Sequence, residues 1–245
     1  MIKKLKNKFN LSGKKILISG TSKGLGKCLV KSFLELDATV ITCNRSNSKS
    51  FLELERKWRN NFFNHNVDIC SLSEISTFVK ENKKSLNPID VIINNAAVLG
   101  PMQPIFSIDN DEIKRVMNTN LYGPMFLIQN LLPIISKGGC IINVSSGMGI
   151  VGTANSGIYG LSKFALEGFS QILHKDLKQK KIRVNVVDPG GMRTTMFAEA
   201  NPHVDTNQIP KPNEIVPMFL WLISDEAKKI NGERIEFNKF KKKKI

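Results

Sequence analysis

The sequence lacks the features of several protein classes. No apolar run approaches the roughly 18–20 residues that a membrane-spanning helix needs, and the basic N-terminus has no apolar stretch typical of a signal peptide. The four cysteines are scattered without a C-x-x-C pair, and the three histidines cluster neither with them nor with one another. We therefore expect no membrane span, no metal site, reduced thiols and a cytoplasmic location.

Negative charge is scarce, since the formal net charge is +15. Residues 1–15 carry six lysines and residues 239–245 carry five, with no acid in either segment, which leaves +4 for residues 16–238. An excess confined to the ends favours solvated tails over a nucleic-acid surface, so we expect no nucleic-acid partner; binding of an anionic surface by the tails is the alternative. The length of 245 residues fits one domain. We predict a basic extension over 1–11, a single domain over 12–238 and a Lys-rich tail over 239–245.

Short apolar runs alternate with stretches of helical spacing. Pro124 predicts a kink or break in a long helix, and residues 190–212, rich in Gly, Pro, Thr and Asn, predict a loop with room for one helical turn. The pattern predicts strands at 15–19, 38–43, 62–67, 89–93, 140–144, 182–187 and 234–237, and helices at 25–36, 48–60, 72–84, 109–135, 158–179 and 214–224. Such alternation predicts a single-domain α/β fold, a Rossmann-type doubly wound parallel sheet of about seven strands with helices on both faces.

A glycine cluster follows the first predicted strand, where ligands of such sheets bind. Gly20, Gly24 and Gly26 follow the pattern G-x-x-x-G-x-G and lead into a helix. Glycines let the backbone approach a pyrophosphate, and a helix N-terminus offers free N–H groups to phosphates. The cluster therefore predicts a dinucleotide loop; a plain tight turn is the alternative.

The residues after the second predicted strand bear on which dinucleotide binds. An acidic residue usually receives the ribose hydroxyl of NAD there, but this chain has Asn44 and Arg45. Arg45 can pair with a 2′-phosphate, and Lys23 adds a second cation. The sequence thus favours NADP(H), with NAD(H) possible; the alternative is that both are solvated surface charges.

Tyr159 and Lys163 lie four residues apart on a predicted helix and therefore share one face. A free tyrosine has a pKa near 10, and a neighbouring ammonium lowers it. Tyr159 would then give a proton to a ketone or take one from an alcohol. Ser146 precedes Tyr159 by 13 residues, and Asn120 lies in the long predicted helix.

Taken together, these motifs resemble the short-chain dehydrogenase/reductase family over about residues 12–237. The motifs stand in the family's order; they are Gly20, Gly24, Gly26, Asp68, Asn94-Asn95-Ala96, Asn120, Ser146, Tyr159, Lys163 and Asp188-Pro189-Gly190 with Thr194. Three features depart from the family pattern: Ala97 replaces a common glycine, Leu161 replaces a common alanine, and the chain ends in lysines.

The resemblance implies a catalytic tetrad. Tyr159 would be the general acid/base, Ser146 would hold the substrate oxygen, Lys163 would bind the nicotinamide ribose and lower the Tyr159 pKa, and Asn120 would hold a water that relays protons. A substrate lid would lie at 190–212. The cofactor-binding residues would be Gly20, Ser22, Lys23, Gly24, Leu25, Gly26, Asn44, Arg45, Asp68, Ile69, Asn94, Ala96, Tyr159, Lys163, Pro189, Gly190 and Thr194.

These observations predict an NADP(H)-dependent oxidoreductase that acts on a carbonyl or secondary alcohol of a small or medium-sized substrate. By resemblance the chain would form a homodimer or homotetramer, with the helices at 109–135 and 158–179 in an interface. A non-catalytic NADP-binding scaffold or sensor is the alternative.

Overall fold

A seven-stranded parallel sheet forms the centre of the molecule. The computed structural model describes residues 5–6, 8–45 and 49–242. Its strands follow the order β3-β2-β1-β4-β5-β6-β7, so the chain reverses its direction of travel across the sheet between β1 and β4. The strands are β1 (Lys15–Ser19), β2 (Thr39–Asn44), β3 (Phe62–Asn66), β4 (Ile89–Asn94), β5 (Ile135–Val144), β6 (Arg183–Asp188) and β7 (Arg234–Glu236). The predicted Rossmann-type fold is confirmed.

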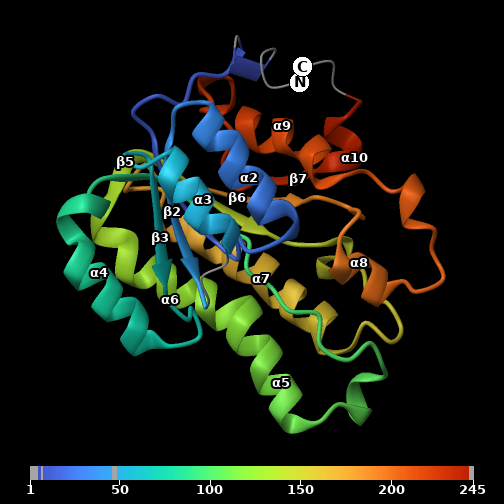
Figure 1. The fold of residues 1–245 in the computed structure, drawn as a ribbon. Helices are drawn as coiled ribbons and strands as arrows, with labels where there is room; N and C mark the ends of the chain where they lie inside the picture. The colour runs from blue at the N-terminus through green and yellow to red at the C-terminus, as the bar shows by residue number, and fades with distance from the viewer. Residues whose placement is uncertain (1–4, 7, 46–48, 243–245) are drawn as a thin grey trace.

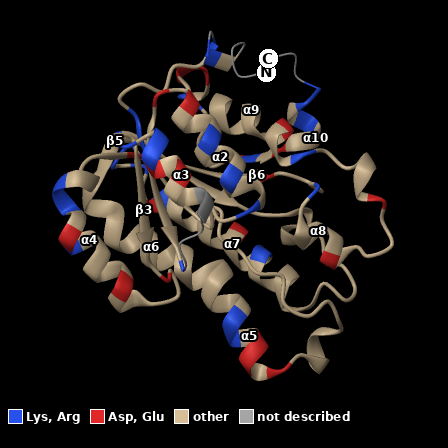
Figure 2. Cartoon of the chain, viewed as in Figure 1, with Lys and Arg blue, Asp and Glu red and all other residues tan. Residues whose placement is uncertain are grey.

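Helices cover both faces of this sheet (Figure 1). One layer contains α2, α3 and α9, and the other contains α4, α6 and α7. The helices are α2 (Gly24–Glu35), α3 (Lys49–Lys57), α4 (Leu72–Leu86), α5 (Asn110–Met117), α6 (Gly123–Leu131), α7 (Gly157–Asp176), α8 (Thr195–Ala200), α9 (Pro212–Ile223) and α10 (Phe237–Phe240). On α4 and α5, charges of both signs lie on the outer surface (Figure 2).

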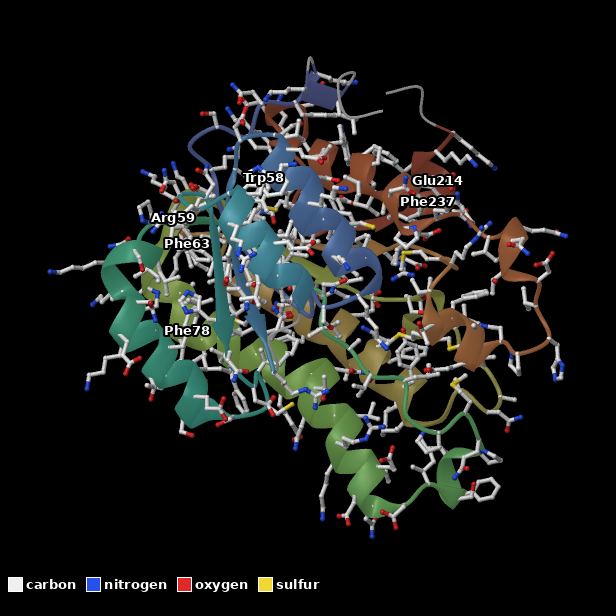
Figure 3. All side chains as sticks on the ribbon, viewed as in Figure 1. Trp58, Arg59, Phe63, Phe78, Glu214 and Phe237 are labelled. Carbon is white, nitrogen blue, oxygen red and sulfur yellow. The ribbon has the colours of Figure 1, made fainter. Side chains whose placement is uncertain are left out.

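Each face of the sheet has its own apolar core. Ile16 and Ile18 of β1 pack with Phe33 of α2 on one face, whereas Leu17 packs with Leu127 of α6 on the other. Successive side chains of a strand point to opposite faces, and a strand covered on both sides is therefore apolar throughout. At the β3 edge, Phe78 of α4 lies beside the sheet (Figure 3). Its ring centre is 4.8 Å from that of His65.

The long helix predicted at 109–135 is broken, as Pro124 indicated. Between α5 and α6 lies one π-helical turn, Asn118–Tyr122, in which the Gly123 N–H donates to the Asn118 carbonyl five residues earlier. Proline has no N–H to give to the carbonyl four residues before it, here that of Asn120. The irregular turn therefore lies just before Pro124. The predicted helical limit at 135 is wrong, because β5 begins at Ile135.

Apolar residues of both predicted tails pack against the body of the protein. Phe9 and Leu11 are buried in the core beside α2 and α9, and the ring of Phe240 lies 5.5 Å from that of Trp221. The expectation of solvated ends is wrong at these positions. That expectation was based on the distribution of charge, which does not take single apolar residues into account. The boundaries 1–11, 12–238 and 239–245 stay predictions.

We predict that Phe9→Ala destabilises the protein by about 3 kcal/mol, because it leaves a cavity in the core. The midpoint of thermal unfolding should fall by roughly 6–12 °C. Calorimetry measures this directly. Lys8→Ala is the matched control next to it and should change the unfolding free energy by less than about 0.5 kcal/mol. Equal midpoints for Phe9→Ala and Lys8→Ala would contradict the burial of Phe9.

Candidate active site

A cavity of about 1810 Å³ opens at the carboxyl edge of the sheet, where the strand order reverses. Ligands of open α/β sheets bind at this place. Loops after six strands contribute to the cavity, together with α7 and the lid region. Of the predicted site residues, these line it: Gly20, Ser22, Lys23, Gly24, Leu25, Asn44, Arg45, Asp68, Ile69, Ala96, Ser146, Tyr159, Lys163, Pro189, Gly190 and Thr194.

The loop after β1 fits the phosphates of a dinucleotide. Gly20 has a φ of +69°, and a Cβ there would overlap the backbone of Ala96. Helix α2 begins at this loop with no side-chain cap and no acidic residue in its first turn. Its N–H groups and the positive end of its dipole are therefore available to an anion.

Asn44 holds this loop in place. Its Oδ1 accepts hydrogen bonds from the Thr21 N–H (2.9 Å) and the Thr21 hydroxyl (3.0 Å), and its Nδ2 donates to Asn64 (2.9 Å). A side chain engaged in this way positions the glycine loop although it also borders the cavity. Its position at the end of a strand predicted a place at the site and did not reveal this supporting role.

The positively charged side chains on which the prediction of NADP(H) rests border the cavity. Arg45 and Lys23 are exposed and line it, and Lys27, which the sequence analysis did not include, lines it as well. Lys27 lies in the first turn of α2, four residues after Lys23 at the N-cap of that helix, and this short spacing could have identified it. Three positive side chains therefore border the cavity near the loops after β1 and β2.

Three predicted residues, Gly26, Asn94 and Asn120, do not line the cavity. The Asn94 side chain donates to Asn143 (2.8 Å), whereas the next residue, Asn95, borders the cavity and donates to the carbonyls of Ser19 (3.1 Å) and Gly20 (2.7 Å). Neighbouring residues at a strand end point to opposite sides. The structure thus places Asn95, not Asn94, beside the glycine loop.

Asn120 lies in the π-helical turn with its side chain buried. Its Oδ1 accepts from the Val98 N–H (2.8 Å), and its Nδ2 donates to the Val98 carbonyl (3.0 Å) and to Ser162 (3.0 Å). The side chain therefore ties the loop after β4 to α7. A role in holding water would fall to its backbone carbonyl, to which Pro124 gives no hydrogen bond.

Tyr159, Ser146 and Lys163 meet at the floor of the cavity. The Ser146 hydroxyl and the Tyr159 phenol both border the cavity, and Ser146 acts to lower the pKa of Tyr159. The Lys163 ammonium is buried, donates to the Val144 carbonyl (2.8 Å) and lies 5.6 Å from the centre of the Tyr159 ring. The tyrosine and lysine come from successive turns of α7, as their spacing predicted.

The ionisation of this pair differs from the expectation. Burial raises the pKa of Tyr159 to about 12; the Ser146 hydroxyl opposes this rise and the Asp188 carboxylate adds to it. In the protein alone, burial outweighs any lowering of the Tyr159 pKa by Lys163, so the lowering expected of Lys163 stays a prediction. Burial lowers the pKa of Lys163 to about 8, against the carboxylates of Glu167 and Asp188. Tyr159 is thus a protonated phenol near neutral pH, ready to donate.

Apolar side chains line the cavity beyond the Tyr159 hydroxyl. They come from the loop after β4, the loop after β5 and the lid, and include Met102, Met148, Met192, Met196 and Phe197. The lid contains helix α8 and a short helical turn at Thr206–Gln208. Among the residues that the structure describes, no helix is long and apolar enough to cross a membrane and no metal-binding group of His, Cys, Asp or Glu occurs.

The glycine loop and the cluster of Tyr159, Ser146 and Lys163 share one cavity of a Rossmann-type sheet, a combination that indicates an oxidoreductase. The chain belongs to the short chain dehydrogenase family, whose model matches residues 14–205. It is 31% identical over 229 residues to the uncharacterized oxidoreductase YciK of Escherichia coli K12, covering 91% of this chain and 90% of that protein.

Solved structures agree with this assignment. A short chain dehydrogenase from Salmonella enterica serovar Typhi superimposes with a TM-score of 0.87 at 29% identity, covering 92% of this chain and 96% of that one. A structure from Escherichia coli CFT073, determined in complex with NADPH, gives a TM-score of 0.85 at 30% identity, covering 92% and 97%.

We predict that the Tyr159 phenol of the protein alone titrates at strongly alkaline pH. The chain has two tyrosines, so in Tyr122→Phe protein labelled with fluorotyrosine Tyr159 gives the single phenolic fluorine signal. Its midpoint in fluorine NMR should lie well above that of free fluorotyrosine, because burial disfavours the phenolate.

The same protein unfolded in urea is the control and should titrate like the free amino acid. A folded-state midpoint below the unfolded one would mean that Lys163 dominates after all.

Proposed function

We propose that this protein is an NADP(H)-dependent oxidoreductase that reduces a carbonyl compound or oxidises the matching secondary alcohol. The meeting of Tyr159, Ser146 and the buried Lys163 in the same cavity as the glycine loop carries the proposal. When bound, the nicotinamide would supply or accept the hydride at the carbonyl carbon.

The chain's own residues would handle the proton. In reduction, Ser146 holds the substrate oxygen and Tyr159 gives its phenolic proton to that oxygen as the hydride arrives at carbon. The Tyr159 phenol keeps its proton across the neutral range, so a proton is available for transfer. Cations that lowered its pKa toward the operating pH would make that transfer easier. Lys163 would hold the nicotinamide ribose, and the Asn120 backbone carbonyl would hold a relay water.

The cavity favours NADP(H) and a substrate with an apolar body. Arg45, Lys23 and Lys27 offer cations for a 2′-phosphate, and a relative at 30% identity was crystallised with NADPH. The methionines and Phe197 beyond Tyr159 fit a small or medium-sized apolar group, since methionine adapts to irregular shapes. NAD(H) would be the weaker cofactor. All four cysteines are free, which fits the proposed cytoplasmic location.

Thermal unfolding with saturating NADPH, NADP⁺, NADH and NAD⁺ tests the binding half of the proposal. A ligand at 100 times its Kd stabilises by about 2.7 kcal/mol, or roughly 5–11 °C for a chain of this size. We expect that shift with the two phosphorylated forms. Tyr159→Phe should keep the shift and lose at least about 100-fold in kcat on a panel of apolar aldehydes and ketones, because the proton donor is gone.

Tyr122→Phe is the matched control and should keep wild-type turnover, since Tyr122 lies outside the cavity. Nucleotide binding without turnover by the wild-type protein would favour the scaffold or sensor. No shift with any nucleotide would exclude both functions.

We also propose a homodimer or homotetramer built on the α6–α7 face. Leu161, Phe164 and Ile172 form an exposed apolar stripe along α7, and Ile172 is 62% exposed. Tyr122 and Phe126 lie at the start of the neighbouring α6, with ring centres 6.2 Å apart. Apolar stripes of this kind on a folded surface are typical of subunit interfaces.

Phe164→Glu should dissociate the assembly, because a carboxylate on each copy would be desolvated at the interface. Light scattering after gel filtration should then report a mass of 27.4 kDa instead of a multiple of it. Phe106→Glu is the matched control, because Phe106 is 90% exposed but lies in the short helical turn Ile105–Ser107, away from the α6–α7 face. A wild-type protein that is monomeric at micromolar concentration would exclude the proposed interface.

A further inference from the structure

One buried arginine outside the predicted site connects three elements that carry site residues. Arg234 opens β7, and its side chain is only 17% exposed. Its guanidinium pairs with Glu167 of α7 and with Asp188 at the end of β6 (2.7 Å), and donates to the backbone carbonyl of Ser146 after β5 (3.1 Å). Glu236 on the same strand lies 3.7 Å from its Nε.

The partners of Arg234 adjoin the catalytic cluster. Glu167 follows Lys163 by one turn of α7, and Asp188 directly precedes the cavity-lining Pro189. The Asp188 carboxylate acts on both Tyr159 and Lys163, and the Glu167 carboxylate acts on Lys163. Both carboxylates are largely buried, with 8% and 13% of the Glu167 and Asp188 side chains exposed.

We propose that Arg234 is a positioning residue for the reaction, which fixes the Ser146 backbone and neutralises the Glu167 and Asp188 carboxylates facing the Tyr159–Lys163 pair. This inference rests on the proposed function. Arg234 does not line the cavity, so it acts through these neighbours and not on substrate.

The direction in which the pKa values of Tyr159 and Lys163 change follows from the charged groups that face these two residues. These are Glu167 from α7, Asp188 from β6, and Arg234 with Glu236 from β7. Without the guanidinium, the two buried carboxylates lose their shared cation. Their negative charge then disfavours a phenolate and favours an ammonium, so the pKa values of Tyr159 and Lys163 both rise.

Arg234→Met tests this in the fluorotyrosine-labelled Tyr122→Phe protein described above. We expect the Tyr159 fluorine midpoint to move up by about one pH unit or more. Adding Asp188→Asn should return the midpoint toward that of the parent protein, because it removes the carboxylate that raises the Tyr159 pKa. Arg234→Lys keeps a cation and should leave the midpoint close to that of the parent protein.

Turnover of the same variants tests the positioning half. With NADPH and an apolar carbonyl substrate, Arg234→Met should lose about tenfold or more in kcat. Arg234→Lys should lose part of this, because a lysine ammonium cannot reach all three partners with the planar fork of arginine. The alkaline limb of the pH–rate profile of Arg234→Lys should stay at the parent pH. The alkaline limb for Arg234→Met should move to higher pH.

Arg183→Met is the matched control. Arg183 is a second buried arginine, on the neighbouring β6, and donates to the carbonyls of Leu222, Ala227 and Ile230, away from the cluster. Its removal should lower the unfolding midpoint without moving the Tyr159 fluorine midpoint or the pH–rate profile. This control separates a general loss of packing from the specific effect of Arg234.

Two results would overturn the inference: a fluorine midpoint that moves no further in Arg234→Met than in Arg183→Met, or wild-type kcat in Arg234→Met. If Arg234→Met does not fold, the turnover of Arg234→Lys decides: a partial loss of kcat supports the inference, and wild-type kcat in Arg234→Lys overturns it. The fluorine midpoint needs neither nucleotide nor substrate. A wild-type protein that reduces no carbonyl compound would therefore refute the proposed function while the midpoint still tests Arg234.

Discussion

The site depends on how closely the loop after β1 approaches the loop after β4. Gly20 lies so near Ala96 that no side chain fits between them, and the Ser19 hydroxyl accepts from the N–H groups of Asn95 (3.3 Å) and Ala96 (3.2 Å). Asn95 returns hydrogen bonds to the carbonyls of Ser19 and Gly20. This contact holds the two loops together at the point where the strand order reverses. It thereby fixes the start of α2 beside the cavity.

The features that the sequence predicted well are those set by local pattern. Strand runs, the glycine loop and the spacing of Tyr159 and Lys163 depend on periodicity and on backbone sterics, which can be read from neighbouring residues. Pro124 likewise predicted a break, because the missing N–H is a property of one residue. The family resemblance then supplied roles for residues that pattern alone left unassigned.

The features that escaped prediction depend on contacts between distant segments. Asn44 and Asn94 stand at strand ends in the sequence, but only the packed sheet shows that one supports Thr21 and the other bonds Asn143. The Tyr159 pKa depends on how much water the fold removes and on where the Lys163 ammonium points. Arg234 pairs with Glu167 and Asp188, which lie 67 and 46 residues earlier in the chain.

Helix α7 serves two environments at once. One side carries Tyr159 and Lys163 beside the cavity, and the other carries the exposed stripe of Leu161, Phe164 and Ile172. These residues alternate along the same turns of the helix. A rotation of α7 about its own axis would therefore displace the side chains of both sets. A substitution that turned the helix about its axis would therefore disturb the cavity side and the exposed side together.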